Sequence, residues 1–72
     1  MTYEVVKKEI RNGAVQKEYN LFDTKRQATK YLRDVAQAEN KANSTVGSIK
    51  DGNIKVFDTD GVMRREYNLN NF

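Results

Sequence analysis

The chain contains no cysteine, histidine, tryptophan or proline. Without cysteine it forms no disulfide, and without cysteine or histidine it lacks the ligands of most transition-metal sites. The absence of histidine also removes the side chain that titrates near neutral pH, which excludes catalysis by a histidine base. No apolar run exceeds three residues, so neither a membrane-spanning helix nor a signal peptide is expected. Abundant lysine and asparagine are typical of low-GC bacterial or phage genes, and we expect a cytoplasmic protein of a bacterial host cell, with no metal and no cofactor.

The 72 residues fit one small α+β domain over 1–72. A chain this short buries only about 60% of its unfolded surface, which leaves a thin core and no room for a deep pocket. Its carboxylates are scattered among lysine and arginine, and the sequence has no glycine-rich phosphate loop or nucleophile motif. We therefore expect no catalytic residues and no enzymatic activity. The net charge of +3 is concentrated between residues 23 and 43, which carry +2.

Residues 3–22 have the pattern of a β-hairpin around Asn12-Gly13. This pair readily adopts the left-handed dihedrals of a two-residue type I′ turn. The turn sets a register in which Lys7 faces Glu18, while Lys8 faces Lys17 as an unfavourable like-charge pair. The same register gathers the apolar residues that we expect to contact the core, which are Val6, Ile10, Val15, Tyr19 and Leu21.

A helix is expected over 24–42, because Thr24 and Gln27 have the spacing of a capping box, with Asp23 as an alternative cap. Its apolar stripe at helical spacing consists of Ala28, Tyr31, Leu32, Val35, Ala36 and Ala42. The rest of the chain predicts strands over 46–50, 54–57 and 62–69, with turns at 51–53 and 58–61. The order β-β-α-β-β-β indicates an antiparallel sheet of four to five strands with one amphipathic helix packed on one face.

Two surfaces are candidates for binding a macromolecule. The first is the outer face of the helix, which consists of Arg26, Lys30, Arg33, Gln37 and Lys41. Cations at helical spacing could contact the phosphates of a nucleic acid or an acidic groove on a protein. Asp34, four residues after Lys30, reduces the positive charge of this stripe. The alternative interpretation is an ordinary solvated helix face.

The second candidate surface combines aromatic and basic residues on the sheet face that we expect to point away from the helix. It consists of Tyr3, Lys7, Arg11, Phe22, Lys55, Phe57 and Arg64. Aromatic and arginine side chains are enriched where proteins contact a partner or a second copy of themselves, so a homodimer is one outcome. Aromatic side chains on an open sheet also stack with the bases of single-stranded nucleic acids. The alternative is that these residues pack at strand ends.

Two further patterns have a structural and a functional interpretation. Residues 12–22 and 60–70 each carry a glycine and, five positions after it, the start of the sequence Glu-Tyr-Asn-Leu. This is either a duplicated binding element or a shared core pattern, and the spacing of Tyr19, Leu21, Tyr67 and Leu69 favours the core. Residues 58–61 resemble the opening of a calcium loop, but the third ligand and the distal glutamate are missing, so a hairpin turn explains them better.

The stretch from Phe22-Asp23-Thr24-Lys25 through the alanine-rich helix to Asp51-Gly52-Asn53-Ile54 resembles small bacterial and phage-encoded strand-strand-helix-strand-strand domains. The resemblance covers residues 3–57 and implies no function or site residue. From size and charge we expect a non-enzymatic binding protein, an accessory factor of a phage or mobile element. It would bind and inhibit or modulate a larger host protein, such as a defence nuclease complex. The alternative is a nucleic-acid-binding module that uses the basic helix face or the aromatic and basic sheet face.

Overall fold

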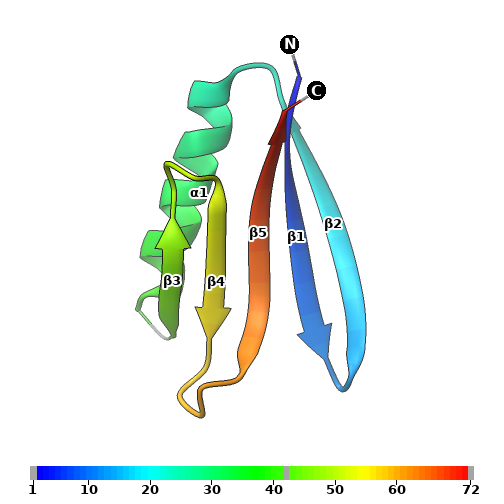
Figure 1. Ribbon diagram of the computed structural model, residues 1–72, viewed down its shortest axis with the longest axis vertical. Coiled ribbons are helices and arrows are strands. Elements are labelled where there is room, and N and C mark those ends of the chain that lie inside the picture. The colour runs from blue at the N-terminus through cyan, green and yellow to red at the C-terminus, as the bar shows by residue number, and fades with distance from the viewer. Residues whose placement is uncertain (1, 42, 72) are drawn as a thin grey trace.

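The computed structural model describes residues 2–41 and 43–71. Its elements are β1 (Tyr3–Arg11), β2 (Ala14–Phe22), α1 (Lys25–Glu39), β3 (Ser44–Ser48), β4 (Asn53–Phe57) and β5 (Met63–Asn71). The five strands form one antiparallel sheet in the order β2-β1-β5-β4-β3 (Figure 1). This confirms the predicted α+β fold and its β-β-α-β-β-β order. The first and last strands are neighbours, with Tyr3 opposite Asn71.

The β1–β2 hairpin turns at Asn12-Gly13, as predicted. Both residues have positive φ, 52° and 78°, which is the backbone conformation that a type I′ turn requires at both central positions. The register follows from this turn, so Lys7 lies opposite Glu18 and Lys8 lies opposite Lys17. The local prediction of the hairpin is therefore confirmed, including its like-charge pair.

The helix begins at the predicted capping box. The hydroxyl of Thr24 accepts a hydrogen bond from the backbone N–H of Gln27 at 3.2 Å, and the side chain of Gln27 accepts one from the backbone N–H of Thr24 at 3.3 Å. The helix ends at Glu39, where the N–H of Asn40 donates to the carbonyl of Ala36 at 3.0 Å. The predicted end at residue 42 was too late, and Ala42 itself lies outside the described residues.

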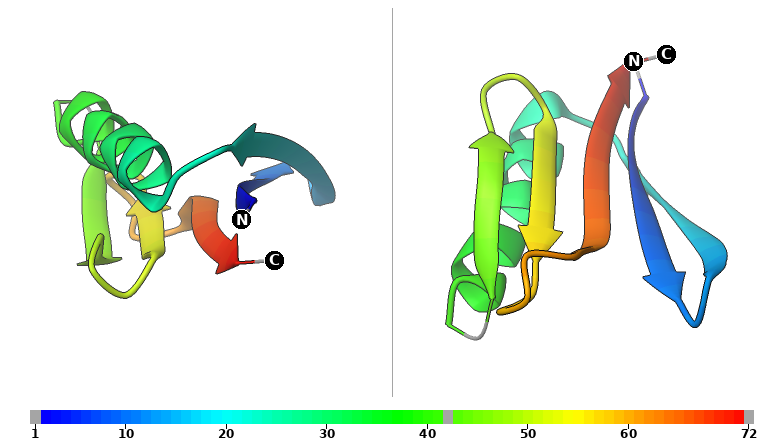
Figure 2. Two further views of the ribbon diagram at one scale, coloured as in Figure 1. Left: turned by 90° about the horizontal axis from the view of Figure 1, so that it is seen from above. Right: turned by 60° about the horizontal axis from the view of Figure 1, so that its bottom comes forward.

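The core lies between the helix and one face of the sheet. Its buried residues are Val5, Ala28, Leu32, Ile54, Val56 and Tyr67. Figure 2 shows the helix lying over this face, while the turn of the β1–β2 hairpin extends beyond it. The core is thus built on β1, β4 and β5, and the outer part of the first hairpin is left uncovered.

The predicted core face of the first hairpin was wrong. Val15, Tyr19 and Leu21 are 52%, 59% and 66% exposed, whereas Val5 is fully buried. The pairing of β1 with β5 explains the inversion, since Lys7 lies opposite the buried Tyr67 and therefore shares its face. Side chains on a strand alternate between the two faces, so Val5 points to the helix, and Val6 points away from it.

The last three strands also differ in detail from their predicted bounds. β3 ends at Ser48, and the half-buried Ile49 packs on the core as the chain enters the turn to β4. Gly52 closes this turn with φ +74° and is buried against Leu69. The carbonyl of Gly52 accepts a hydrogen bond from the N–H of Leu69 at 2.7 Å. A register shift between Val56 and Phe57 then interrupts the pairing of β4 with β5.

Candidate binding surfaces

The helix presents its predicted cationic stripe to solvent. Arg26, Lys30, Arg33 and Gln37 are all exposed on α1, and the exposed Lys41 follows the end of the helix. Within residues 2–41 and 43–71, none of these basic side chains forms an ion pair, and this includes Lys30, which is not paired with Asp34. The stripe exists because helical spacing alone brings these residues together. It is compatible both with binding of an anion and with simple solvation.

The second candidate surface is not assembled by the fold. Tyr3 and Phe22 lie on the helix side and pack against the core, and the ring of Phe22 lies 5.4 Å from that of Tyr31. Lys7 and Arg11 share this helix side, whereas Lys55 and Phe57 alternate with the inward Ile54 and Val56. The expectation that all seven residues share one face was therefore wrong. The pairing of β1 with β5 turns the odd-numbered residues of β1 toward the helix, whereas Lys55 points to the other side.

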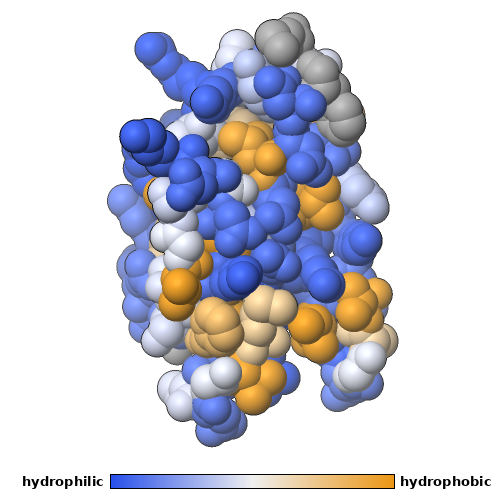
Figure 3. Space-filling model, in the orientation of Figure 1, coloured by the Kyte–Doolittle hydropathy of each residue, from blue (hydrophilic) through white to orange (hydrophobic). Residues whose placement is uncertain are grey.

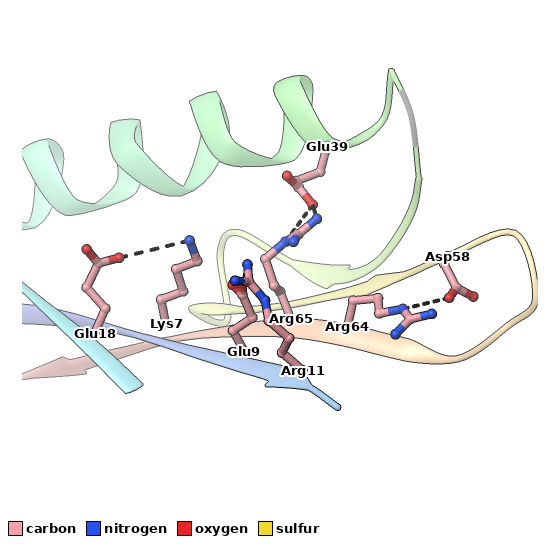
Figure 4. A network of polar contacts seen from close by, with 8 residues as sticks. All are labelled: Lys7, Glu9, Arg11, Glu18, Glu39, Asp58, Arg64 and Arg65. Atoms are coloured by element: carbon pink, nitrogen blue, oxygen red, sulfur yellow. Dashed lines mark hydrogen bonds and ion pairs between the residues drawn. The ribbon is translucent and has the colours of Figure 1, made fainter. Parts of the chain in front are cut away.

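Ion pairs occupy the charged side chains on the helix side of the sheet (Figure 4). Lys7 Nζ lies 4.0 Å from Glu18 Oε2, and Arg11 Nη2 lies 3.2 Å from Glu9 Oε1. Arg65 on β5 reaches the helix, where its Nε and Nη2 donate to Glu39 Oε2 at 3.0 Å and 2.8 Å. The hydrogen bond to Glu39 raises the pKa of Arg65. This side of the sheet therefore has little unpaired charge to offer a ligand.

The carboxylate of Asp58 organises the turn between β4 and β5. Its Oδ1 accepts hydrogen bonds from the N–H groups of Asp60 and Val62, and its Oδ2 accepts one from Arg64 Nε at 2.7 Å. These hydrogen bonds, first the one from Val62, lower the pKa of Asp58. The turn interpretation of residues 58–61 is thus confirmed. Among the described residues, no group of three or more carboxylates is placed to hold a metal ion.

The opposite side of the sheet, which we call the helix-free face, is a second exposed surface. Its middle row runs across the strands as Lys17, Lys8, Glu66 and Lys55, each opposite the next. A hollow of about 430 Å³ lies on this face and is lined by Glu4, Val6, Lys8, Lys17, Tyr19, Glu66, Asn68 and Asn70. Figure 3 shows this surface with a hydrophilic centre and hydrophobic groups toward its margins.

The amide of Asn53 organises the β4–β5 part of this face. It donates to Glu66 Oε2 at 3.1 Å and to Asn68 Oδ1 at 2.6 Å. These bonds fix the position of the one carboxylate in the middle row. Glu66 lies opposite Lys8 on one side and opposite Lys55 on the other, so it stands between the lysines of β1 and β4 in this row. Lys17, at the outer end of the row, has no strand on its other side among those described.

The exposed apolar residues of β2 are the part of this face that the sequence prediction missed. Val15, Tyr19 and Leu21 were assigned to the core because they alternate as core residues do, yet all three are exposed on the edge strand. The Glu-Tyr-Asn-Leu repeat shows the same contrast. Tyr19 lies opposite Val6 and is exposed, whereas Tyr67 lies opposite Lys7 and is buried. The two copies therefore occupy opposite faces, and a common core role is excluded.

No helix within residues 2–41 and 43–71 is long and apolar enough to cross a membrane. Comparison with known proteins found no matching family model, no similar curated protein and no similar solved structure.

Proposed function

We propose that this chain is a non-enzymatic binding module that docks on a larger protein through its helix-free face. The observation that supports this proposal is the exposure of Val15, Tyr19 and Leu21 on the same side of β2, where Tyr19 and Leu21 are neighbours and Lys17 separates them from Val15. Aromatic and aliphatic groups gathered in one exposed area are typical of protein interfaces, and tyrosine is enriched there. The lysines of the middle row supply polar contacts around these apolar groups.

The test compares two pairs of exposed residues. Tyr19→Ser with Leu21→Ser removes the apolar groups of β2, and Val62→Ser with Ala38→Ser is the control, because both residues are exposed and lie outside the sheet, before β5 and on α1. The tagged chain and both double variants are used to capture proteins from bacterial cells, and the captured proteins are quantified by mass spectrometry. We expect a partner that the control variant retains and the β2 variant loses. Equal capture by the two variants would contradict the proposal.

The biological role proposed for this module is inhibition or modulation of a larger host protein, as an accessory factor of a phage or mobile element. A small domain without a catalytic site acts by occupying a surface that its target needs. The test is the plating efficiency of phage on bacteria that carry a defence nuclease and express the chain. Increased plating that the β2 double variant abolishes is the expected result, and unchanged plating across several such nucleases would refute this role.

The alternative function is nucleic-acid binding through the helix stripe, and the exposure of Arg26, Lys30 and Arg33 favours it. Three phosphate contacts would weaken binding by about 40-fold between 50 and 200 mM salt. Binding to mixed-sequence DNA and RNA is measured across this range, with Arg26→Glu, Lys30→Glu and Arg33→Glu combined in one variant. Steep salt dependence that this variant abolishes would establish the alternative, and no binding at low salt would remove it.

A further inference from the structure

The outer edge of β2 carries backbone groups that no described strand pairs. β2 lies at the end of the sheet and runs for nine residues. In a hairpin with a two-residue turn, Arg11 and Ala14 form a hydrogen-bonded pair, so the even-numbered residues of β2 direct their N–H and C=O groups to β1. The odd-numbered residues direct theirs outward. These are Val15, Lys17, Tyr19 and Leu21.

The same four residues present their side chains on the helix-free face. Any strand that pairs with the outward N–H and C=O groups therefore also places alternate side chains beside Val15, Tyr19 and Leu21, which are all more than half exposed. Residues directly opposite each other on neighbouring antiparallel strands point to the same face and contact each other. An added strand would thus cover the exposed apolar groups that the fold leaves on β2.

The charges of the middle row indicate what should lie opposite Lys17. Lys17 faces Lys8 on β1, and like charges directly opposite each other destabilise a sheet. Lys8 has Glu66 on its other side, but Lys17 is the last residue of the row. A carboxylate on an added strand would give Lys17 a neighbour of opposite charge, as Glu66 does for Lys8. On the helix side, Glu18 already faces Lys7, and a basic residue on its outer side would continue this alternation of charge.

A second copy of this chain fits the edge less well. A two-fold axis normal to the sheet pairs β2 with itself antiparallel, and the residue at the axis faces its own copy. A pairing centred on Lys17 or Glu18 therefore sets two like charges against each other. Centring on Tyr19 avoids this but places the charged Lys17 against the apolar Leu21 of the other copy. Centring on Asn20 sets Tyr19 against Leu21, but β2 ends at Phe22, so only residues 18–22 of each copy pair and Val15 stays uncovered.

The other edge of the sheet is less suited to strand addition. β3 has five residues, and Gly47 in its middle has φ +122°, outside the conformation of a regular strand. A short and irregular edge is a common protection against pairing with further strands. The contrast leaves β2 as the long regular edge of this sheet.

We propose that the edge of β2 binds an extended segment of the partner protein as an added antiparallel strand, which deepens the proposed function and rests on it. The segment that fits has apolar residues opposite Leu21, Tyr19 and Val15, a carboxylate opposite Lys17 and a basic residue opposite Glu18. Read from its N-terminus, its pattern is apolar, any, apolar, basic, acidic, any, apolar. Main-chain hydrogen bonds supply affinity in this mode, and the alternate side chains supply specificity.

Two peptides of identical composition test the pattern. One carries the core sequence Leu-Thr-Val-Lys-Glu-Thr-Val, and in the other the lysine and glutamate are exchanged. We expect the first to bind about 3- to 30-fold more tightly by fluorescence anisotropy, since the exchange turns two favourable cross-strand pairs into unfavourable ones. Lys17→Glu, an exposed substitution, should reduce or reverse this preference. Equal affinities of the two peptides, or a preference unchanged by Lys17→Glu, would overturn the proposal.

Hydrogen exchange locates the bound peptide on the edge. The outward amides of Lys17 and Tyr19 should become protected when the first peptide binds, while those of Gln16 and Glu18, already paired with β1, should change little. Val15→Pro removes an outward N–H without breaking the ladder to β1 and should abolish binding, whereas Val15→Thr should retain it. Binding without protection of the outward amides would overturn strand addition.

Two measurements separate this inference from the proposed function. If neither peptide binds but capture of a protein partner still requires Tyr19 and Leu21, the added strand is refuted and the binding module stands. If the first peptide binds and capture is insensitive to these residues, docking through the helix-free face fails while the edge still accepts a strand. A dimeric mass by sedimentation that Val15→Pro abolishes would assign the edge to a second copy and overturn the proposal.

Discussion

Replacing Gly52 by alanine tests the packing of the β3–β4 turn on β5. Gly52 has φ +74°, and a Cβ at this position would lie 2.8 Å from the Cβ of Leu69. Because the near atom belongs to the root of the Leu69 side chain, a rotamer change does not relieve the clash. One of the two backbones has to move, and the hydrogen bond from the N–H of Leu69 to the carbonyl of Gly52 weakens with it.

Gly13→Ala is the matched control for this substitution. Gly13 has nearly the same φ, +78°, but a Cβ there would have nothing within 4 Å. Left-handed backbone costs an alanine about 1–2 kcal/mol, offset by about 0.4–1 kcal/mol from the smaller conformational freedom of the unfolded chain. Both variants share these contributions, so their difference isolates the contact with Leu69.

The expected difference is about 1–3 kcal/mol, the usual cost of overpacking a site that is already filled. A domain of this size has a free energy of unfolding of about 4–11 kcal/mol, so the effect is a large part of the total. Urea and thermal unfolding followed by circular dichroism measure it, and the midpoint of Gly52→Ala should lie at least about 4 °C below that of Gly13→Ala. Two variants that unfold within about 0.5 kcal/mol of each other would refute this account of the turn.

Three further predictions concern the helix and its contact with the sheet. Thr24→Ala removes the capping hydroxyl and should destabilise the domain by about 1 kcal/mol in urea unfolding. Thr24→Ser keeps a hydroxyl and should therefore retain most of that stability. Arg65→Met keeps the aliphatic stem but removes both hydrogen bonds to Glu39, so the free energy of unfolding should fall by about 1–2 kcal/mol. Adding Glu39→Gln should recover part of this loss, because the carboxylate is then no longer left without its partner. Additive losses in the double variant would contradict a direct contact. Burial, with a smaller contribution from Glu39, raises the pKa of Tyr67 to about 12. The unfolded chain therefore releases this proton first, near pH 10, so stability should fall from pH 10 to 12. Tyr67→Phe should flatten that fall, and an unchanged slope would show that Tyr67 is not its source.

The sequence sufficed for features that depend on residues close together in the chain. Asn12 and Gly13 determine the first hairpin and its register, because few other residues adopt their dihedrals. Thr24 and Gln27 determine where the helix begins, because they bond to each other across one turn. The exposed stripe around Arg26, Lys30 and Arg33 follows from helical spacing alone, so this candidate surface was placed correctly, whereas its binding partner remains a prediction.

The faces of the sheet could not be predicted in the same way. The first hairpin has apolar residues on both sides, with Val5 on one and Val6 on the other, so its own alternation favours neither. The pairing of Lys7 with Tyr67, sixty residues away in the chain, selects the side that the helix covers. The second candidate surface was divided between two faces for this reason, and the exposed apolar residues of β2 were mistaken for core.

The sequence by itself thus determined the elements of this protein, their order and the absence of cysteine and histidine chemistry. The tertiary structure decided which face of the sheet is core and which is open. The physical reason is that a strand presents two faces, and only its neighbours in the sheet determine which one can be buried. With β5 placed between β1 and β4, Val5 joins Ile54 and Tyr67 under the helix. The edge of β2 and its exposed Tyr19 are consequently left on the helix-free face, where we propose that a partner binds.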